Sequence, residues 1–223
     1  MEDLLHWYVA VNMFQNFCRQ VFDLGIKDLK NRKAIDIKKT DCISGLIRRQ
    51  TIQNIERIAE RVLIQDIHRK KETGFLQGKT PEEQYRFYHE KWLDCRENVY
   101  KILKEFPELA RLLFMEIQCN YELADEILEH LETDHSQIIK TFCDGRDFGD
   151  IREVSFMGDA HNRGKKTARV ELDNGVTVYY KPHCLQNSQR YQEIYAYLCK
   201  KAGISCIEPV SYTHLTLPTK LEV

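Results

Sequence analysis

Apolar residues recur every three or four positions from the start of the chain to about residue 145, with polar residues between them. This spacing places apolar side chains on one face of an α-helix, so it predicts a series of amphipathic helices. The two clearest stripes comprise Leu4, Leu5, Tyr8, Val11 and Phe14, and Ile47, Ile52, Ile55, Ile58, Val62 and Leu63. We expect such stripes to form a packed core rather than a cofactor site.

Local signals mark where some of these helices begin and end. A glycine-containing loop over residues 74–79 is followed by Thr80-Pro81-Glu82-Glu83. Thr80 can cap a helix, proline suits the first helical position, and Glu83 completes a capping box. One helix is therefore expected from Pro81 onward, until Pro107 breaks it and opens the next.

After residue 145 the pattern changes to short runs rich in β-branched and aromatic residues. Strands are expected over residues 154–156, 167–172 and 176–180, followed by a helix over 188–201. Asn174-Gly175 lies between the last two strands and predicts a hairpin whose two central turn residues both have positive φ. The fold class is therefore α+β, a mainly helical region followed by a three-stranded antiparallel sheet and a helix.

Composition narrows the class of protein. The 223 residues include 33 Lys and Arg against 34 Asp and Glu, and this formal charge of −1 argues against a general nucleic-acid binder. The most apolar stretch, Leu109–Met115, is short and contains Arg111, so no membrane span is predicted. The acidic start does not fit a signal peptide, and the eight cysteines form no zinc pattern, so a cytoplasmic protein with reduced thiols is expected.

Candidate chemistry begins in the segment 158–166, between the first two expected strands. Gly158, Asn162 and Gly164 lie in a polar loop there, and the third strand ends at Lys181. Kinase-like folds cover a nucleotide with such a loop and bring a lysine on the third strand to its phosphates. Glu193, on the following helix, is the candidate carboxylate for orienting that lysine.

Asp159 and His161 are two residues apart in the same loop, where both could face one pocket. A carboxylate and an imidazole beside a lysine can perform acid–base chemistry near neutral pH. On pattern alone, two simpler interpretations remain open. Asp159 and His161 could form a polar turn whose side chains hydrogen-bond to its own backbone. Lys181 could be a solvated lysine at a strand end.

Several motifs in one order resemble the dehydratase domain of class II lanthipeptide synthetases. The main ones are G-D-A-H-N-R-G-K at 158–165 and E-L-D-N-G-V-T-V-Y-Y-K-P at 171–182. Upstream pieces that agree lie at 78–87, 106–113 and 126–134. The resemblance covers roughly residues 55–205.

This resemblance implies a dehydratase that uses ATP and Mg²⁺ to phosphorylate Ser and Thr in a leader-bearing precursor peptide, then eliminates phosphate to leave dehydroamino acids. A separate zinc-containing cyclase would follow it. By motif position, Lys181 is expected near the ATP phosphates and in elimination. Asp159 and His161 match the pair implicated in the elimination step.

The sequence departs from the family pattern in ways that predict a truncated fragment. His183 stands where the family often has Arg, and neither a catalytic loop nor metal-binding residues can be placed after Lys181. The Mg²⁺ ligands and the zinc site are expected downstream, so this polypeptide alone is expected to be inactive. Residues 210–219 resemble a translated sequencing adapter, which would end the natural sequence near Pro209.

Three segments are therefore expected. Residues 1–145 form the helical region of the dehydratase, 146–209 the start of a kinase-like small lobe, and 210–223 the adapter-derived tail. Two other functions stay open at this point. One is another kinase-like phosphotransferase, and the other is a non-enzymatic helical module that binds peptides.

Overall fold

The computed structural model describes residues 14–32, 37–161, 165–182 and 186–205; of residues 37–44, 160–161 and 186–189 it describes the backbone alone. The chain divides into two compact units, residues 1–122 and 123–223. Helices precede a three-stranded antiparallel sheet and a further helix, which confirms the α+β class. Of the expected stripe near residue 8, only Phe14 is described, and it is buried. The expected adapter segment lies outside the described residues.

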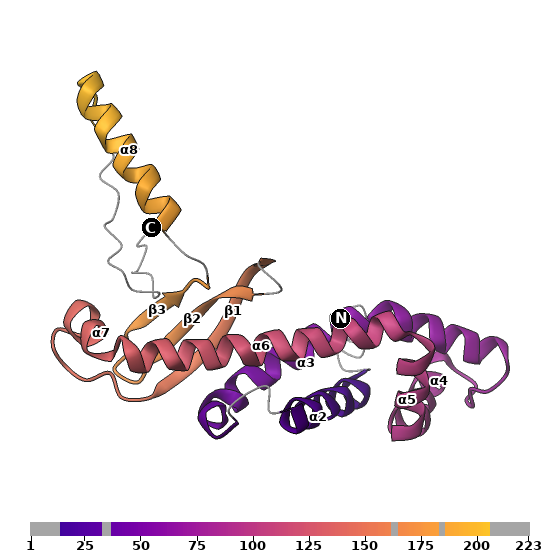
Figure 1. Ribbon diagram of the computed structural model, residues 1–223. Helices are drawn as coiled ribbons and strands as arrows, with labels where there is room; N and C mark the ends of the chain where they lie inside the picture. The colour runs from indigo at the N-terminus through magenta and orange to yellow at the C-terminus, as the bar shows by residue number, and fades with distance from the viewer. Residues whose placement is uncertain (1–13, 33–36, 162–164, 183–185, 206–223) are drawn as a thin grey trace. The chain divides into compact units, whose positions relative to one another are not determined.

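The first unit is a packed set of helices (Figure 1). Its elements are α2 (Gln15–Arg32), α3 (Ile37–Glu72), α4 (Pro81–Phe87), the π-helix η1 (Tyr88–Leu93), α5 (Arg96–Glu105) and the N-terminal part of α6 (Pro107–Thr133). The expected stripe between residues 47 and 63 supplies part of the core, because Ile47, Ile55 and Leu63 are fully buried. The helix starts at Pro81 and Pro107 are confirmed, and Thr80 and Glu83 form both halves of the capping box.

The expectation of one continuous helix from Pro81 to Pro107 is wrong. The α-helix ends at Phe87, a π-helical turn follows, and Cys95 is extended before α5 begins. Tertiary hydrogen bonds stabilise this interruption. The side-chain amide of Gln20 donates to the Leu93 carbonyl at 2.7 Å, and that of Asn98 donates to the Trp92 carbonyl at 3.2 Å. These side chains donate to carbonyls that have lost their regular helical partners. The spacing of apolar residues in the sequence does not reveal such hydrogen bonds.

A buried carboxylate organises the middle of the first unit. Asp66 is only 1% exposed, and it accepts hydrogen bonds from the Tyr88 hydroxyl at 2.8 Å and the Arg69 guanidinium at 2.7 Å. The Lys70 ammonium lies 3.4 Å from the centre of the Trp92 ring and 3.8 Å from Asp66. Burial lowers the pKa of Lys70 and raises that of Tyr88. The carboxylate is therefore fully partnered, as a buried charge must be.

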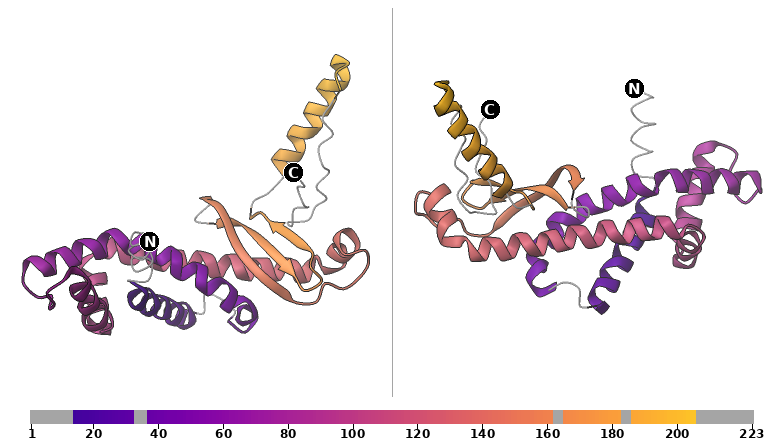
Figure 2. Two further views of the ribbon diagram at one scale, coloured as in Figure 1. Left: turned by 180° about the vertical axis from the view of Figure 1, so that it is seen from behind. Right: turned by 45° about the horizontal axis from the view of Figure 1, so that its top comes forward.

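The second unit contains the C-terminal part of α6, the helices α7 (His135–Phe142) and α8 (Gln186–Ala202), and one sheet. The strands β1 (Ile151–His161), β2 (Lys165–Leu172) and β3 (Thr177–Tyr180) pair in that order, all antiparallel. Alternate strand residues are buried, among them Val154, Phe156, Ala168, Val170, Val178 and Tyr180. The C-terminal part of α6 lies along the sheet in both views of Figure 2 and contributes Ile127 and Leu131 to the core.

The hairpin between β2 and β3 is confirmed, but its turn differs from the expected one. Leu172 accepts from Gly175 N at 2.9 Å, and its own N–H donates to the Val176 carbonyl at 2.9 Å, so three residues form the loop. Gly175 has φ +83°, whereas Asn174 does not have a positive φ. The Asn174 side chain instead accepts from Val176 N at 3.0 Å. This is the three-residue hairpin that needs only one left-handed residue.

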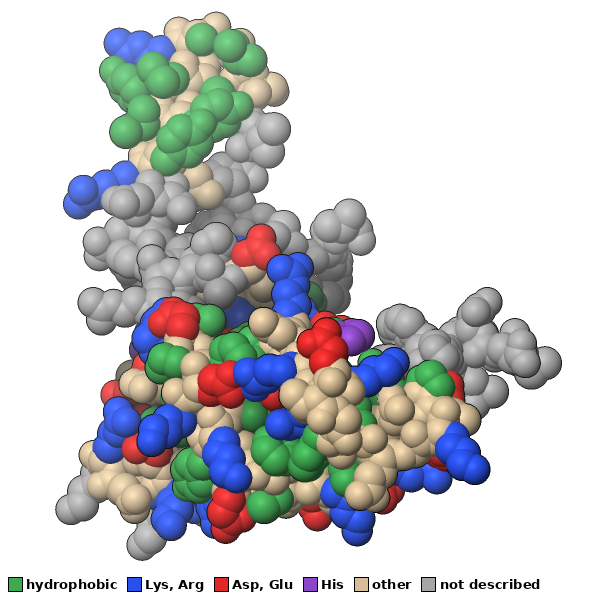
Figure 3. Space-filling model, turned by 90° about the vertical axis from the view of Figure 1, so that its right-hand side faces the viewer, with side chains coloured by type: hydrophobic (Ala, Val, Ile, Leu, Met, Phe, Trp, Pro, Cys, Tyr) green, Lys and Arg blue, Asp and Glu red, His purple; other side chains and the backbone are tan. Residues whose placement is uncertain are grey.

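Helix α8 carries large apolar side chains that are exposed. They include Tyr191, Ile194, Tyr197 and Leu198. Figure 3 shows hydrophobic side chains gathered along this helix. Contiguous apolar surface of this kind is uncommon on a soluble monomer and favours association.

Cys18, Cys143 and Cys199 are buried and, like Cys95, form no disulfide with a described residue. Burial raises the pKa of the Cys18 thiol, so this side chain behaves as a small core residue. In the described part of the chain, no helix is both long enough and apolar enough to cross a bilayer.

Candidate functional site

The strands β1 and β2 continue into the glycine-flanked motif, so the expected loop is shorter than the sequence indicates. Met157 pairs with Thr167 and His161 pairs with Lys165, which leaves Gly158, Asp159 and Ala160 opposite the single residue 166. Gly158 has φ +71°, a conformation that a side chain disfavours. A bulge containing such a glycine bends the strand and redirects neighbouring side chains, and bulges of this kind are common beside functional sites.

Lys181 directly follows β3, as the motif predicts. It is half-buried, and its ammonium makes no ion pair with any residue that the structure describes. Tyr180 pairs with Ala168, so the next position of the strand is level with Thr167 and hence with Met157. Strand alternation places Lys181 on the face opposite to the buried Tyr180. The lysine thus follows the third strand at the level where the bulge of β1 begins.

The other predicted site residues are described to different degrees. Asp159 is exposed and makes no hydrogen bond or ion pair within the described part of the chain. His161 ends β1, but its side chain lies outside the described residues, as do Asn162 and Gly164. Glu193 is an exposed residue of α8 that forms no ion pair with a described residue. The grouping of Asp159 with His161 and the orienting role of Glu193 therefore stay predictions.

The structure shows a polar network, on the other face of the sheet, that the sequence reasoning missed. The Tyr180 hydroxyl donates to Glu126 Oε1 at 2.7 Å and lies 2.8 Å from His130 Nδ1. The second oxygen of Glu126 pairs with the ammonium of Lys165. The rings of Tyr180 and His130 also stack, with centroids 5.5 Å apart. We call these four residues the α6–sheet network.

Its hydrogen-bond directions follow from the number of protons available. A tyrosine hydroxyl has one proton, and here Glu126 accepts it. The contact with His130 then requires the histidine Nδ1 to carry the donor hydrogen. Burial raises the pKa of Tyr180, and the hydrogen bond to Glu126 raises it further. The hydroxyl therefore stays protonated and acts as a fixed link between β3 and α6.

Two sequence signals point toward this network. Tyr180 alternates with Val178 on the inward face of β3, and a buried tyrosine hydroxyl normally requires a partner. Glu126 lies within the upstream segment 126–134 that resembles the lanthipeptide family. Neither signal identifies the partner, because Glu126 and Tyr180 are 54 residues apart in sequence.

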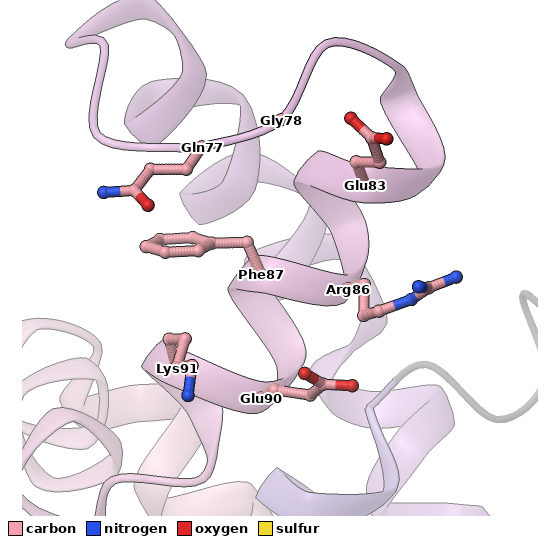
Figure 4. A pocket seen from close by; sticks show the side chains of 7 residues that line it. All are labelled: Gln77, Gly78, Glu83, Arg86, Phe87, Glu90 and Lys91. Carbon is pink, nitrogen blue, oxygen red and sulfur yellow. The ribbon is translucent and has the colours of Figure 1, made fainter.

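The first unit has a surface pocket. It is lined by Gln77, Gly78, Glu83, Arg86, Phe87, Glu90 and Lys91. In Figure 4 the ring of Phe87 faces the pocket below Gln77, whereas the Arg86 side chain points away. One lining carboxylate is already used, because Glu83 caps α4. The pocket contains none of the predicted site residues.

No group of three or more His, Cys, Asp and Glu side chains in the described residues could hold a metal ion. The features that fit a nucleotide are the lysine after β3, which lacks an anionic partner among those residues, and the glycine-containing bulge.

Comparison with known proteins gives two matches. Residues 106–211 match a domain of unknown function, DUF4135. The chain is also 24% identical over 185 residues to a lacticin 481/lactococcin biosynthesis protein from Lactococcus lactis subsp. lactis. Both matches support the lanthipeptide synthetase family. The second alignment covers 83% of this chain but only 18% of the relative, so the chain spans less than a fifth of that protein.

The region matched by the domain family contains the α6–sheet network, the bulge of β1 and Lys181. The matched domain thus includes the part of the chain that carries the candidate chemistry. Helices α2 to α5 precede the matched region, so the domain family does not cover them.

Proposed function

We propose that this chain is part of the dehydratase of a class II lanthipeptide synthetase and that its second unit binds ATP through Lys181. The observation that carries the proposal is the position of Lys181. This half-buried lysine follows the third strand of an antiparallel sheet, is level with a glycine-containing bulge, and lacks an ion pair among the described residues. An ammonium in this setting is suited to a phosphate group.

The first step of the proposed reaction is transfer of the γ-phosphoryl group of ATP to a Ser or Thr hydroxyl, which releases ADP. Catalysis of phosphoryl transfer rests mainly on positioning the reacting groups and on stabilising the negative charge of the phosphates in the transition state. Lys181 would supply positive charge to the phosphates, and backbone N–H groups near Gly158 would approach their oxygens. Mg²⁺, when bound, would neutralise further phosphate charge.

The second step is elimination of the phosphate. A base removes the α-proton of the phosphorylated residue, its electron pair forms the Cα–Cβ double bond, and the Cβ–O bond breaks with departure of phosphate. Asp159 and His161 are the candidate acid–base pair, and Lys181 would stabilise the departing anion. The exposure of Asp159 is consistent with contact with a large substrate such as a peptide.

The proposed partner is a leader-bearing precursor peptide, and the proposed location is the cytoplasm. A peptide substrate fits the name of the Lactococcus relative, which refers to the biosynthesis of lacticin 481 and lactococcin. The zinc cyclase and the Mg²⁺ ligands implied by the family resemblance would belong to other parts of a longer protein.

Nucleotide binding by this chain tests the proposal. Isothermal titration with ATP and Mg²⁺ would compare wild type with Lys181→Ala and with Lys140→Ala. The control removes the same charge from an exposed position of α7. We expect ATP to bind wild type and the control with equal affinity, and Lys181→Ala at least about tenfold more weakly, the effect of losing one charge-assisted hydrogen bond.

Each possible result separates the proposal from its competitors. Absence of ATP affinity in wild type would favour a non-enzymatic helical module that binds peptides. Equal weakening by both lysine substitutions would indicate only non-specific attraction of the anion. If ATP binds through Lys181, a longer protein that includes this chain is needed for the next step, since this chain alone is expected to be inactive. Incubation of that longer protein with a phosphoserine peptide, monitored by mass spectrometry for loss of phosphoric acid, distinguishes a dehydratase from another kinase-like phosphotransferase.

A further inference from the structure

We propose that Glu126 is a positioning residue that fixes the end of β3 relative to the tip of the β1–β2 hairpin. This inference rests on the proposed function, since Glu126 would hold Lys181 and the hairpin tip at the distance at which both can contact one ligand. Glu126 itself is on the α6 side of the sheet, whereas Lys181 follows the strand on the opposite face.

The two carboxylate oxygens of Glu126 contact two different strands. Oε1 accepts from the Tyr180 hydroxyl at 2.7 Å, and Oε2 pairs with the ammonium of Lys165. Tyr180 is bonded directly to Lys181, and Lys165 pairs across the hairpin with His161. One side chain of α6 therefore connects Tyr180, the neighbour of Lys181, with Lys165, the strand partner of His161.

This link matters because regular strand pairing stops short of the tip. The last pair between β2 and β3 joins Ala168 to Tyr180, so Lys165 lies three residues beyond the reach of β3. Between Lys165 and the rest of the hairpin, the β1 strand is bulged. Without Glu126, backbone hydrogen bonds alone would leave the relative position of the tip and the end of β3 weakly determined.

Burial indicates that both contacts persist in water. Tyr180 is fully buried, while the side chains of Glu126 and Lys165 are 27% and 32% exposed. An exposed ion pair contributes little, but these two charges are largely shielded from solvent and one of them also accepts a buried hydroxyl proton. His130 fixes the opposite side of that hydroxyl, so the tyrosine has a single hydrogen-bonding geometry.

Amide hydrogen exchange of this chain, without nucleotide, tests the link directly. The variants are Glu126→Gln, which removes the charge that holds Lys165, and Tyr180→Phe, which removes the hydroxyl. Glu129→Gln is the matched control, because Glu129 is on the same helix, acts on Tyr180 only through its charge, and is exposed. We expect at least about tenfold faster exchange at residues 165–167 and 179–181 in both test variants.

Residues 169–172, in the C-terminal half of β2, report on global stability. Unchanged exchange there, with selective acceleration at the tip and at the end of β3, would show positioning. Uniform acceleration of all three segments would show a merely structural role and would overturn the inference, as would the absence of any effect. Equal acceleration in Glu129→Gln would attribute the effect to charge alone and would also overturn it.

A second arm separates this inference from the proposed function. Titration with ATP and Mg²⁺ should show at least about tenfold weaker binding to Glu126→Gln than to wild type or Glu129→Gln. If wild type binds no ATP but the selective exchange effect is present, the proposed function fails and the link stands. If wild type binds ATP and Glu126→Gln binds it equally well, the nucleotide site stands and the positioning role fails.

Discussion

The hydroxyl of Tyr88 lies 2.8 Å from Oδ2 of Asp66, in the interior of the first unit. Tyr88 begins the π-helical turn, and Asp66 is on α3, so this hydrogen bond joins the irregular segment to the longest helix described. The same carboxylate accepts from Arg69. A local interruption of helical structure is thus fixed by a buried polar contact between distant parts of the sequence.

Replacement of Tyr88 by Phe should lower the free energy of unfolding by roughly 2 kcal/mol, the range for a hydrogen bond to a charged group. The ring is retained, so the loss would come from the hydroxyl and from the lost partner of Asp66. Urea unfolding monitored by circular dichroism measures this change. Tyr100→Phe, at an exposed tyrosine, is the control and should lie within about 0.5 kcal/mol of wild type. Similar stability of the two variants would contradict the prediction.

The first unit should lose stability as the pH falls through the histidine range, and His89 should contribute to that loss. Burial lowers the pKa of His89 below the ordinary value of 6.5, and its Nε2 is buried without a hydrogen-bond partner in the described structure. At the same pH the unfolded chain therefore binds more protons than the folded chain. The free energy of unfolding consequently decreases as the pH drops below the ordinary value and toward the lowered one.

Urea unfolding at pH 8 and pH 5.5 would measure this dependence in wild type, His89→Gln and His68→Gln. Glutamine stays neutral at both pH values, so His89→Gln should show the smaller decrease. His68 is exposed and should behave as wild type. An equal decrease in wild type and His89→Gln would show that other groups produce the whole effect.

Gly25 is a buried helical residue whose replacement by alanine should destabilise the protein. A Cβ there would lie 2.5 Å from Cδ1 of Ile117, closer than carbon atoms approach. Alanine gains roughly 1 kcal/mol in helix propensity, but overpacking a core typically costs about 1–3 kcal/mol. We expect a net loss of about 1 kcal/mol, measured by thermal or urea unfolding.

A double-mutant cycle identifies the cause of that loss. Ile117→Val removes the clashing methyl group, so Gly25→Ala should cost less in its presence than in wild type. Gly45→Ala is the matched control, because Gly45 is also helical and has nothing within 4 Å of the added Cβ. That control should be stabilising by up to about 1 kcal/mol. Additive effects of the two core substitutions would contradict a direct clash.

The apolar surface of α8 should cause self-association. Replacing both Ile194 and Leu198 by Lys should reduce oligomer formation and the binding of a dye specific for exposed apolar surface, because both side chains are exposed. Lysine is a good helix former, so the helix itself should be retained. Sedimentation velocity at increasing protein concentration measures the change. Ala196→Lys adds charge at an exposed position without removing a large apolar side chain, so it should reduce association less. Equal reduction by both would attribute the effect to net charge.

Local signals in the sequence were sufficient for much of the fold. Thr80 and Glu83 identified a helix start because both halves of a capping box lie within four residues, and Pro107 identified another for a similarly local reason. The order and antiparallel pairing of the three strands also followed from their alternating pattern and short connections. The motifs on which the resemblance to the lanthipeptide family rests, at 158–165 and 171–182, are local patterns of the same kind.

The features that were missed depend on contacts between distant residues. The break after Phe87 is stabilised by Gln20, which is far from it in sequence, so helical spacing alone predicted a continuous helix. The turn at Gly175 was assigned the wrong type because Asn174 bonds to the backbone instead of adopting positive φ. Glu126 received no role in the candidate site, since only the folded chain brings α6 to Tyr180.

Pro182, immediately after Lys181, has a consequence for the edge of the sheet. Proline has no backbone N–H, so it cannot extend the ladder of β3 by donating to β2. The last pair that β3 makes is therefore Ala168 with Tyr180, and residues 165–167 of β2 have neighbours from β1 but none from β3. Among the described residues, the main-chain groups on that side of residues 165–167 therefore have no strand partner, so the ladder of the sheet ends three residues earlier at this edge than the length of β2 alone would allow.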